Sequence, residues 1–403
     1  MTASHRLTAL LCGAEVLSMT GFATYAALLP VLRQTWGLTN SEAGLISGAF
    51  FGGYMTAVPV LTSLTDRVDA RRVYAFGSAL AAIGLLGFAA LAGGLWPAVL
   101  LQMLAGAGLA GTYMPGLKIL TDHVDAPRRG RWVAFYTSSF GVGASLSLLL
   151  ASVASGVGGW RAAFAAAGLG PIAAGLVVSG VVPAAPSPPS GPSGAPTAGF
   201  RAVVRARPAL ACILGYAVHC WELFGFRSWV VAFLTFNRSF QPAGREMPMS
   251  APAFVAGVNL LGPPASILGN ELASRLGTAR FVRAVMLVSA ALACAVGVSG
   301  PWPWRWAAAA VCVYFIAIMA DSSTLTAAVV AAAPAAHRGA TMAVHSFLGF
   351  GAGFVAPIVF GVVLDATGGG HAARGWLFAC ASLGLVSAVG GLTVPAAMRE
   401  AGR

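Results

Sequence analysis

The chain has 403 residues, of which 58% are hydrophobic and only 9% are charged. Soluble domains carry about 25% charged residues, so this composition excludes an ordinary soluble protein and indicates a chain that lies within a lipid bilayer. The net charge of +12 would suit a nucleic-acid-binding protein, but the basic residues lie in short clusters between apolar runs. That pattern is typical of membrane topology, and we therefore expect no nucleic-acid partner.

Apolar runs of bilayer length, about 20 residues each, can be marked off by charges and turn residues. The sequence predicts twelve spans, in chain order 7–32, 42–65, 73–94, 96–121, 132–157, 161–183, 208–236, 251–274, 281–300, 304–333, 339–364 and 375–397. The run at 304–333 is long, and its tryptophan-rich beginning suits a membrane interface.

A Pro-, Ser- and Gly-rich segment separates the sixth span from the seventh and reads as a linker. We therefore predict two domains, 1–183 and 208–403, joined by a cytoplasmic linker at 184–207. The two halves also show an internal repeat, because Glu15 precedes Glu222 by 207 positions and Arg67 precedes Arg275 by 208. The expected fold is all-α, with twelve transmembrane helices in two pseudo-symmetric six-helix bundles and a solute site between them near the midplane.

Basic residues fix the predicted orientation, since they concentrate in cytoplasmic loops. With the N-terminus inside, sixteen Lys and Arg residues lie in inner segments and six in outer ones. The inner ones are Arg6, Arg67, Arg71, Arg72, Arg128, Arg129, Arg131, Arg201, Arg205, Arg207, Arg275, Arg280, Arg283, Arg338, Arg399 and Arg403. The outer ones are Arg33, Arg161, Arg238, Arg245, Arg305 and Arg374. Both termini are therefore expected in the cytoplasm.

The loop after the second span reads Ser63-Leu-Thr-Asp-Arg-Val-Asp-Ala-Arg-Arg, and a second copy begins at Gly269. With the two six-helix repeats and the linker, this loop resembles the signature of the major facilitator superfamily. The second copy keeps Arg275 but has Ser274 in place of the acid, and the first copy lacks the family's glycines. The resemblance implies secondary transport and loops that latch the cytoplasmic face.

The resemblance also implies gating roles for Asp66, Arg67, Arg131 and Arg275. Asp66 is expected to accept hydrogen bonds from a neighbouring helix N-terminus or to pair with Arg131. The alternative for the arginines is that they serve only membrane topology, since basic residues are expected in short cytoplasmic loops. Span four has Gln102 where family members that export drugs often carry a basic residue, which weakens a drug-export reading.

Span seven carries His219, Glu222 and Arg227 at membrane depth, where an ionisable group costs roughly 2.5–3.5 kcal/mol. His219 and Glu222 share one helix face, whereas Arg227 lies about 140° around from Glu222, so a direct pair between those two is not expected in a regular helix. We interpret Glu222 as a proton-coupling carboxylate and Arg227 as a contact for an anionic solute. The alternative is a buried ion pair that fixes the helices.

Four further residues are candidates for the pathway. Glu15 is expected either to bind a proton or to lie solvated at the cytoplasmic interface. Asp321 lies in a polar island of an alanine-rich span and is expected to couple protons, to pair with Arg227 or to bond to neighbouring hydroxyls. Tyr113 and Asn259 complete the candidates.

Cys12, His219, Cys220, Met247 and Met249 include soft ligand types, but none of them has a recognised metal spacing. We predict no metal and no cofactor, and no catalytic arrangement indicates an enzyme. The predicted function is a secondary active transporter that moves a small polar or anionic solute by alternating access, coupled to protons. A proton-driven exporter of drugs or metabolites, a transition-metal transporter and a non-transporting sensor are the alternatives. The expected state is a monomer in a bacterial inner membrane.

Overall fold

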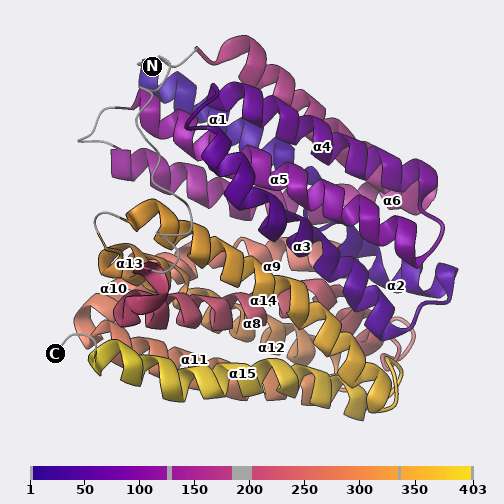
Figure 1. Ribbon diagram of the computed structural model, residues 1–403. Coiled ribbons are helices and arrows are strands. Elements are labelled where there is room, and N and C mark those ends of the chain that lie inside the picture. The colour runs from indigo at the N-terminus through magenta and orange to yellow at the C-terminus, as the bar shows by residue number, and fades with distance from the viewer. Residues whose placement is uncertain (1–2, 125–128, 184–201, 335–336, 401–403) are drawn as a thin grey trace. The chain divides into compact units, whose positions relative to one another are not determined.

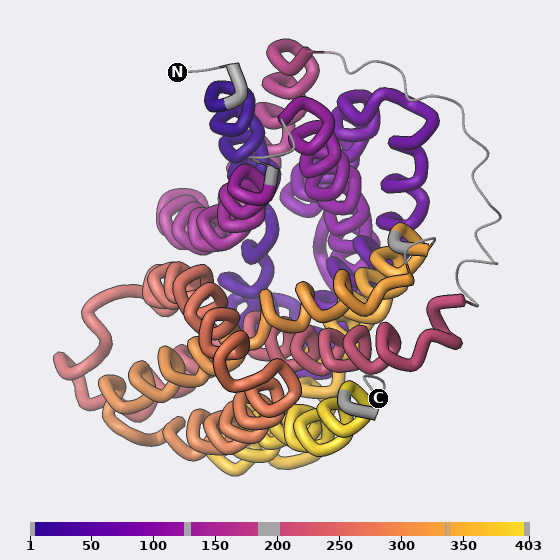
Figure 2. The backbone as a smooth tube through the Cα atoms, turned by 90° about the vertical axis from the view of Figure 1, so that its left-hand side faces the viewer, coloured from indigo at the N-terminus to yellow at the C-terminus, as the bar shows by residue number. Residues whose placement is uncertain are grey.

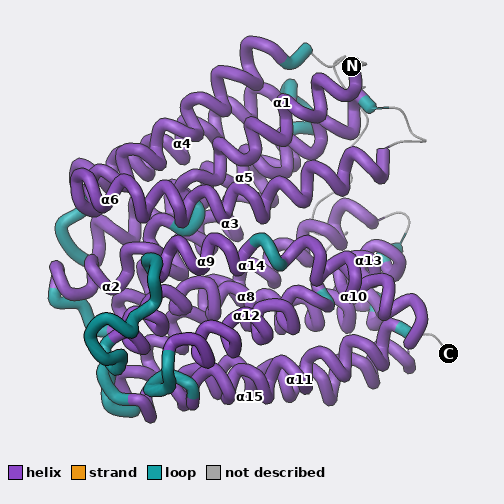
Figure 3. The backbone as a smooth tube through the Cα atoms, turned by 180° about the vertical axis from the view of Figure 1, so that it is seen from behind, coloured by secondary structure: helices purple, strands orange, loops and turns teal. Residues whose placement is uncertain are grey.

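The computed structural model describes residues 3–124, 129–183, 202–334 and 337–400, and within these ranges it contains helices and no strand (Figure 3). The first half contains α1 (Ala3–Ser18), the 3-10 turn η1 (Met19–Gly21), α2 (Thr24–Trp36), α3 (Asn40–Leu64), α4 (Ala70–Leu91), α5 (Leu95–His123) and α6 (Arg129–Val181) (Figure 1). The second half contains α8 (Arg207–Arg238), α9 (Ala251–Asn259), α10 (Gly262–Leu276), α11 (Thr278–Val298), α12 (Trp304–Ala320), α13 (Ser322–Ala332), α14 (Arg338–Ala366) and α15 (Ala373–Glu400).

Eleven helical runs in the described ranges are long and apolar enough to cross a membrane. One of them, 52 residues long, contains non-helical backbone at Gly158 and at Gly159, where φ is +69°. Glycine tolerates such a φ, so α6 turns there and makes two spans. The chain is therefore a multi-pass membrane protein, and the twelve predicted spans are confirmed to within a few residues at their ends.

Two predicted spans of the second half are broken where the sequence predicted continuous helices. Residues 260–261 separate α9 from α10, just before Gly262-Pro263-Pro264, because proline cannot donate the backbone hydrogen bond of a helix interior. Asp321 separates α12 from α13 with φ −93° and ψ −5°. Ser322 and Ser323 follow it, and such short polar side chains compete with helical backbone bonds.

Glycines bring helices of the first half together at backbone distance. A Cβ at Gly53 of α3 would collide with the carbonyl oxygen of Met103 on α5, and a Cβ at Gly106 of α5 would collide with that of Phe50 on α3. In a bilayer, apolar side chains gain little by leaving lipid, so close packing at small residues is what holds helices together.

The chain forms two compact units by its internal contacts. The first comprises Met1–Gly37, Ala49–Gly191 and Pro252–Leu260, and the second comprises Leu38–Gly48, Pro192–Ala251 and Leu261–Arg403. The domain boundaries given above stay a prediction, and residues 184–201 of the expected linker lie outside the described ranges. In the second unit α8 lies beside α14, as the rose and orange tubes of Figure 2 show.

Candidate functional site

Helix α8 supplies most of the candidate site. Pro208 occupies its first turn, where a missing N–H costs nothing, and most of its later residues are buried on every side. It packs against α12, α13, α14 and α15. The polar side chains of α8 therefore find partners on neighbouring helices, on these four and, for Glu222, also on α11.

His219 of α8 and Asp321 form a buried hydrogen bond, with Nδ1 and Oδ1 2.8 Å apart and the two side chains 2% and 4% exposed. Asp321 lies at the break between α12 and α13. Asp321 is thus bonded to His219 through Oδ1, and the predicted pairing with Arg227 stays a prediction. The serine hydroxyl nearby, Ser323, instead bonds to the carbonyl oxygen of Ser266 on α10 at 2.8 Å.

A row of aromatic and imidazole rings continues from this hydrogen bond. The ring of Tyr216 lies 5.8 Å from that of His219 and 3.8 Å from that of His345 on α14. Gly349 makes room for it, since a Cβ there would lie 2.6 Å from the Tyr216 ring. The Nδ1 atom of His345 is buried and has no hydrogen-bond partner among the described residues. We call Tyr216, His219, Asp321 and His345 the histidine cluster.

Glu222, one turn along α8, is buried in a different setting. Its Oε2 accepts hydrogen bonds from Ser289 of α11 at 2.9 Å and from Ser387 of α15 at 2.7 Å. Its Oε1 has no hydrogen-bond partner among the described residues, although Tyr314 of α12 faces the same carboxylate. Neither serine was predicted from the sequence, because each is a single hydroxyl within an otherwise apolar run.

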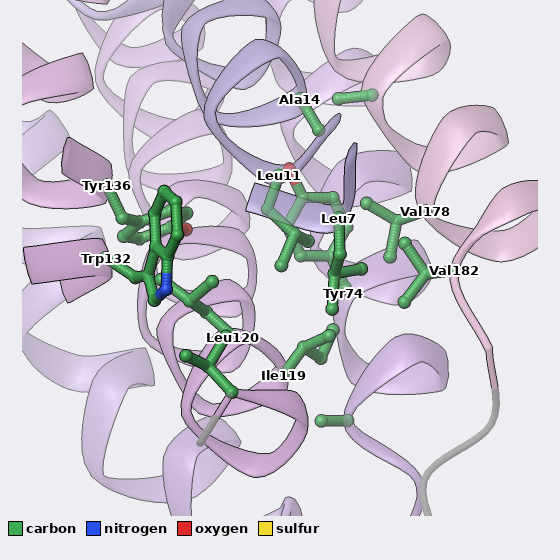
Figure 4. Close-up of a cluster of buried hydrophobic side chains, with 13 residues drawn as sticks. Leu7, Leu11, Ala14, Tyr74, Ile119, Leu120, Trp132, Tyr136, Val178 and Val182 are labelled. Carbon is green, nitrogen blue, oxygen red and sulfur yellow. The ribbon is translucent and has the colours of Figure 1, made fainter. Parts of the chain in front are cut away.

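Glu15 repeats this arrangement in the first unit. It is 0% exposed, so the alternative of a solvated interfacial residue is wrong. Its Oε2 accepts from the Tyr136 hydroxyl at 3.1 Å and lies 3.4 Å from the Ser18 hydroxyl, while its Oε1 has no partner in the described part of the chain. Tyr136 belongs to a buried cluster in which its ring lies near Trp132 and Leu120 (Figure 4).

Arg227 extends toward α12, where its guanidinium lies over the Phe315 ring at 5.5 Å. Glu222 instead contacts α11 and α15, which agrees with the expected separation of the two side chains around α8. The planar guanidinium of an arginine has N–H edges whose geometry matches that of a carboxylate or phosphate.

The remaining pathway candidates, Tyr113 and Asn259, belong to the first unit. Tyr113 of α5 stacks on Tyr136 at 5.8 Å and also accepts a hydrogen bond from the Tyr136 hydroxyl through its carbonyl oxygen at 3.0 Å. Asn259 is buried at the last position of α9 and is counted in the first unit.

In the loop between α3 and α4, the residue that caps a helix is Asp69 and not Asp66. Asp69 immediately precedes α4, accepts from the Arg71 backbone N–H at 2.9 Å and pairs with the Arg71 side chain at 2.7 Å. The hydrogen bond from the Arg71 side chain lowers the pKa of Asp69 below its usual value, and the Arg71 backbone N–H acts in the same direction. Arg71 also donates to the carbonyl oxygen of Val182 at 2.9 Å, whereas Asp66 is exposed.

Two of the predicted gate arginines, Arg131 and Arg275, contact residues of their own helices. Arg131 lies 5.7 Å from the Phe135 ring, and Arg275 forms an exposed pair with Glu271 at 2.8 Å. Arg67 is exposed. Their gating roles therefore remain predictions.

Two smaller observations concern charge and metal. Lys118 pairs with Asp122 at 3.0 Å, with both side chains partly exposed. Among the residues that the structure describes, no three His, Cys, Asp or Glu side chains are grouped to hold a metal ion.

Comparison with known proteins places this arrangement in a family. The model of the Major Facilitator Superfamily matches residues 11–357, so the chain belongs to that superfamily of membrane transporters. Protein spinster homolog 1 of Homo sapiens is 27% identical over 247 residues, which cover 58% of this chain and 46% of the human protein. The "Probable 4-methylmuconolactone transporter" of Cupriavidus pinatubonensis is 28% identical over 137 residues, 32% of this chain and 30% of that protein. The chain therefore spans less than half the length of the curated relatives it matches.

Solved structures agree on the fold. A bacterial homologue of the human lysosomal transporter Spinster, in an inward-facing and unoccupied conformation, has a TM-score of 0.75 at 16% identity, covering 100% of this chain and 98% of that one. A POT family transporter in complex with 5-aminolevulinic acid has a TM-score of 0.77 at 14% identity, covering 99% and 97%. The chain thus has the fold of a major facilitator transporter.

Proposed function

We propose that the protein is a proton-coupled secondary transporter of an organic solute with an anionic group, working by alternating access. It would act as a monomer in a bacterial inner membrane with both termini in the cytoplasm. The observation that carries the proposal is the burial of Glu222 among neutral donors within the α8 bundle.

The surroundings of Glu222 suit a carboxyl group that binds and releases a proton. Its described hydrogen-bond partners are the serine hydroxyls of α11 and α15, which are neutral. A charged carboxylate without a cation at membrane depth is costly, so this arrangement is better suited to the protonated group. Any shift of α11 or α15 that admits water would favour release of the proton. Proton binding is thereby linked to the conformation of the bundle.

Arg227 supports the anionic character of the solute. Its guanidinium is held on the Phe315 ring, and the bidentate edge of an arginine fits a carboxylate or phosphate. The histidine cluster, to which Tyr216 and His219 of the same helix belong, places further ionisable side chains beside α8. Proton and solute would then bias the same conformational equilibrium, which is the condition for coupling.

Export of an amphipathic metabolite is a second candidate. It is supported by the similarity to a "Probable sphingolipid transporter spinster homolog 2" of Arabidopsis thaliana, which is 25% identical over 133 residues. A lipid with an anionic headgroup also presents the chemistry that Arg227 suits.

The test is a solute screen on purified protein in liposomes that contain a pH-sensitive dye. The panel comprises monocarboxylates, amino acids, nucleosides and lysophospholipids. We expect one anionic class to move protons, and the movement to be lost in Arg227→Gln but kept in Arg238→Gln, an exposed arginine at the end of the same helix. Proton movement driven equally by neutral or cationic solutes, or unchanged in Arg227→Gln, would refute the anionic assignment.

A further inference from the structure

The last turn of α14 binds the first turn of α3. Both oxygens of Asp365 are engaged, since Oδ1 accepts from the backbone N–H of Asn40 at 3.1 Å and from its side-chain amide at 2.7 Å. Oδ2 accepts from the backbone N–H of Ser41 at 2.8 Å and from its hydroxyl at 2.6 Å. Four donors on two oxygens fill the accepting capacity of an ionised carboxylate. The contact lies within the second unit, to which residues 38–48 belong.

Below this carboxylate the two helices meet along their backbones. A Cβ at Gly44 would collide with the carbonyl oxygen of Pro357, and a Cβ at Gly48 with that of Phe354. From the other side, a Cβ at Gly361 would collide with the carbonyl oxygen of Asn40. We call the contact between residues 40–48 and 354–365 the glycine seam. At these three glycines the helices approach each other through backbone atoms, so little side-chain repacking is needed there when the seam parts and closes.

Asp365 is not needed to begin α3. Thr39 and Glu42 already form the reciprocal bonds of a capping box, with Glu42 accepting from the Thr39 backbone N–H at 2.9 Å and donating its own N–H to the Thr39 hydroxyl at 3.2 Å. The bonds of Asp365 therefore act mainly to hold α3 against α14. Residues 40–48 of α3 belong to the second unit, and the rest of the helix belongs to the first.

We propose that Asp365 is a releasable latch that sets how often the glycine seam opens during the transport cycle. The side chain is exposed, so water replaces its four donors when the helices part. The bonds are charge-assisted and thus strong enough to bias an equilibrium, while their exposure keeps the cost of release small. On the predicted topology this end of both helices faces the outer side, so the latch controls access from outside.

The test measures the opening of the seam directly and requires neither solute nor protons. The six native cysteines are replaced, and Ser47→Cys places a single thiol in the seam segment, where Ser47 is 6% exposed. The rate of labelling by a membrane-impermeant maleimide then reports opening. We expect Asp365→Asn to raise this rate about tenfold, which corresponds to about 1.4 kcal/mol, and Ser41→Ala to raise it several-fold.

Two controls separate a latch from general loosening. Thr367→Ala removes the hydroxyl of the residue that follows α14, which donates to the carbonyl oxygen of Val363 within that helix, and should leave the rate unchanged. Ser299→Cys places the thiol at a buried position away from the seam, where Asp365→Asn should have no effect. Equal rates in Asp365→Asn and Thr367→Ala, or an equal acceleration at Ser299→Cys, would overturn the proposal. Failure of proton coupling alone would leave it standing.

Discussion

At the scale of single residues, the buried contact between His219 and Asp321 gives an energetic prediction if it is held as a charged pair. Removing one partner of a buried pair leaves the other charge uncompensated and typically costs about 3–5 kcal/mol. The exposed pair of Lys118 and Asp122, whose side chains are 31% and 37% exposed, should contribute about 1 kcal/mol or less.

We therefore expect Asp321→Asn to lower the free energy of unfolding by several kcal/mol more than Asp122→Asn does. Equilibrium unfolding of the purified protein in mixed micelles measures both variants under the same conditions. If Asp321→Asn is no more destabilising than Asp122→Asn, the two groups are not held as a buried charged pair.

The sequence revealed which residues carry charge in the apolar runs but not how they are paired. Glu222, His219 and Asp321 stood out because ionisable groups are rare at membrane depth. Their partners depend on which helices become neighbours, and a lone serine such as Ser289 or Ser387 differs little from the many serines of membrane helices. Asp365 was missed for a related reason, since an acid at the end of a span reads as an interfacial residue.

At the scale of helices, glycine spacing determines how closely α3 and α5 approach. We expect Gly106→Ala to destabilise the protein strongly, because its Cβ would meet the backbone of Phe50, which cannot move aside as a side chain can. Gly13→Ala is the matched control, since no atom lies within 4 Å of its added Cβ and alanine is the better helix former by up to about 1 kcal/mol. Thermal unfolding in detergent compares the two, and a Gly106→Ala variant as stable as Gly13→Ala would contradict the close approach.

The cap of α4 gives a prediction that depends on pH. Asp69→Ala should cost about 1 kcal/mol at neutral pH, as the loss of a helix N-cap does. The pKa of Asp69 is lowered in the folded protein, so its contribution is fully present above the unfolded value of about 3.9 and disappears as the pH falls through the folded value.

Unfolding curves at pH 7 and near pH 3 measure this difference. The difference in the free energy of unfolding between the parent protein and Asp69→Ala should be smaller at the lower pH. Because Asp66 is exposed, Asp66→Ala should be about as stable as the parent at both pH values. A gap that widens in acid would show that the carboxylate of Asp69 is not the stabilising form.

Span number and span ends were predictable, because length and hydropathy decide them. The breaks at residues 260–261 and at Asp321 were not, since proline and serine are tolerated within membrane helices and only tertiary contacts determine whether the helix stops. The cap at Asp69 was missed because the family signature drew attention to Asp66, whereas the helix begins one residue after Asp69.

At the scale of the whole molecule, each unit contains one buried carboxylate with the same pattern of bonds. Glu15 and Glu222 are 207 positions apart, and each has one oxygen bonded to hydroxyls and one with no partner among the described residues. This is what two copies of one ancestral bundle would retain, and it agrees with the repeat read from the sequence. Proton coupling through Glu222 is the central claim of this account.

The most direct test compares two modes of transport in Glu222→Gln, with the anionic solute that the screen identifies. Counterflow exchanges solute for solute and needs no net proton movement, whereas accumulation against a gradient needs protons to be released on each cycle. Glu222→Gln should therefore keep counterflow and lose accumulation driven by a pH gradient. A variant that still accumulates solute when only a pH gradient is imposed would contradict the assignment of Glu222 as the coupling carboxyl.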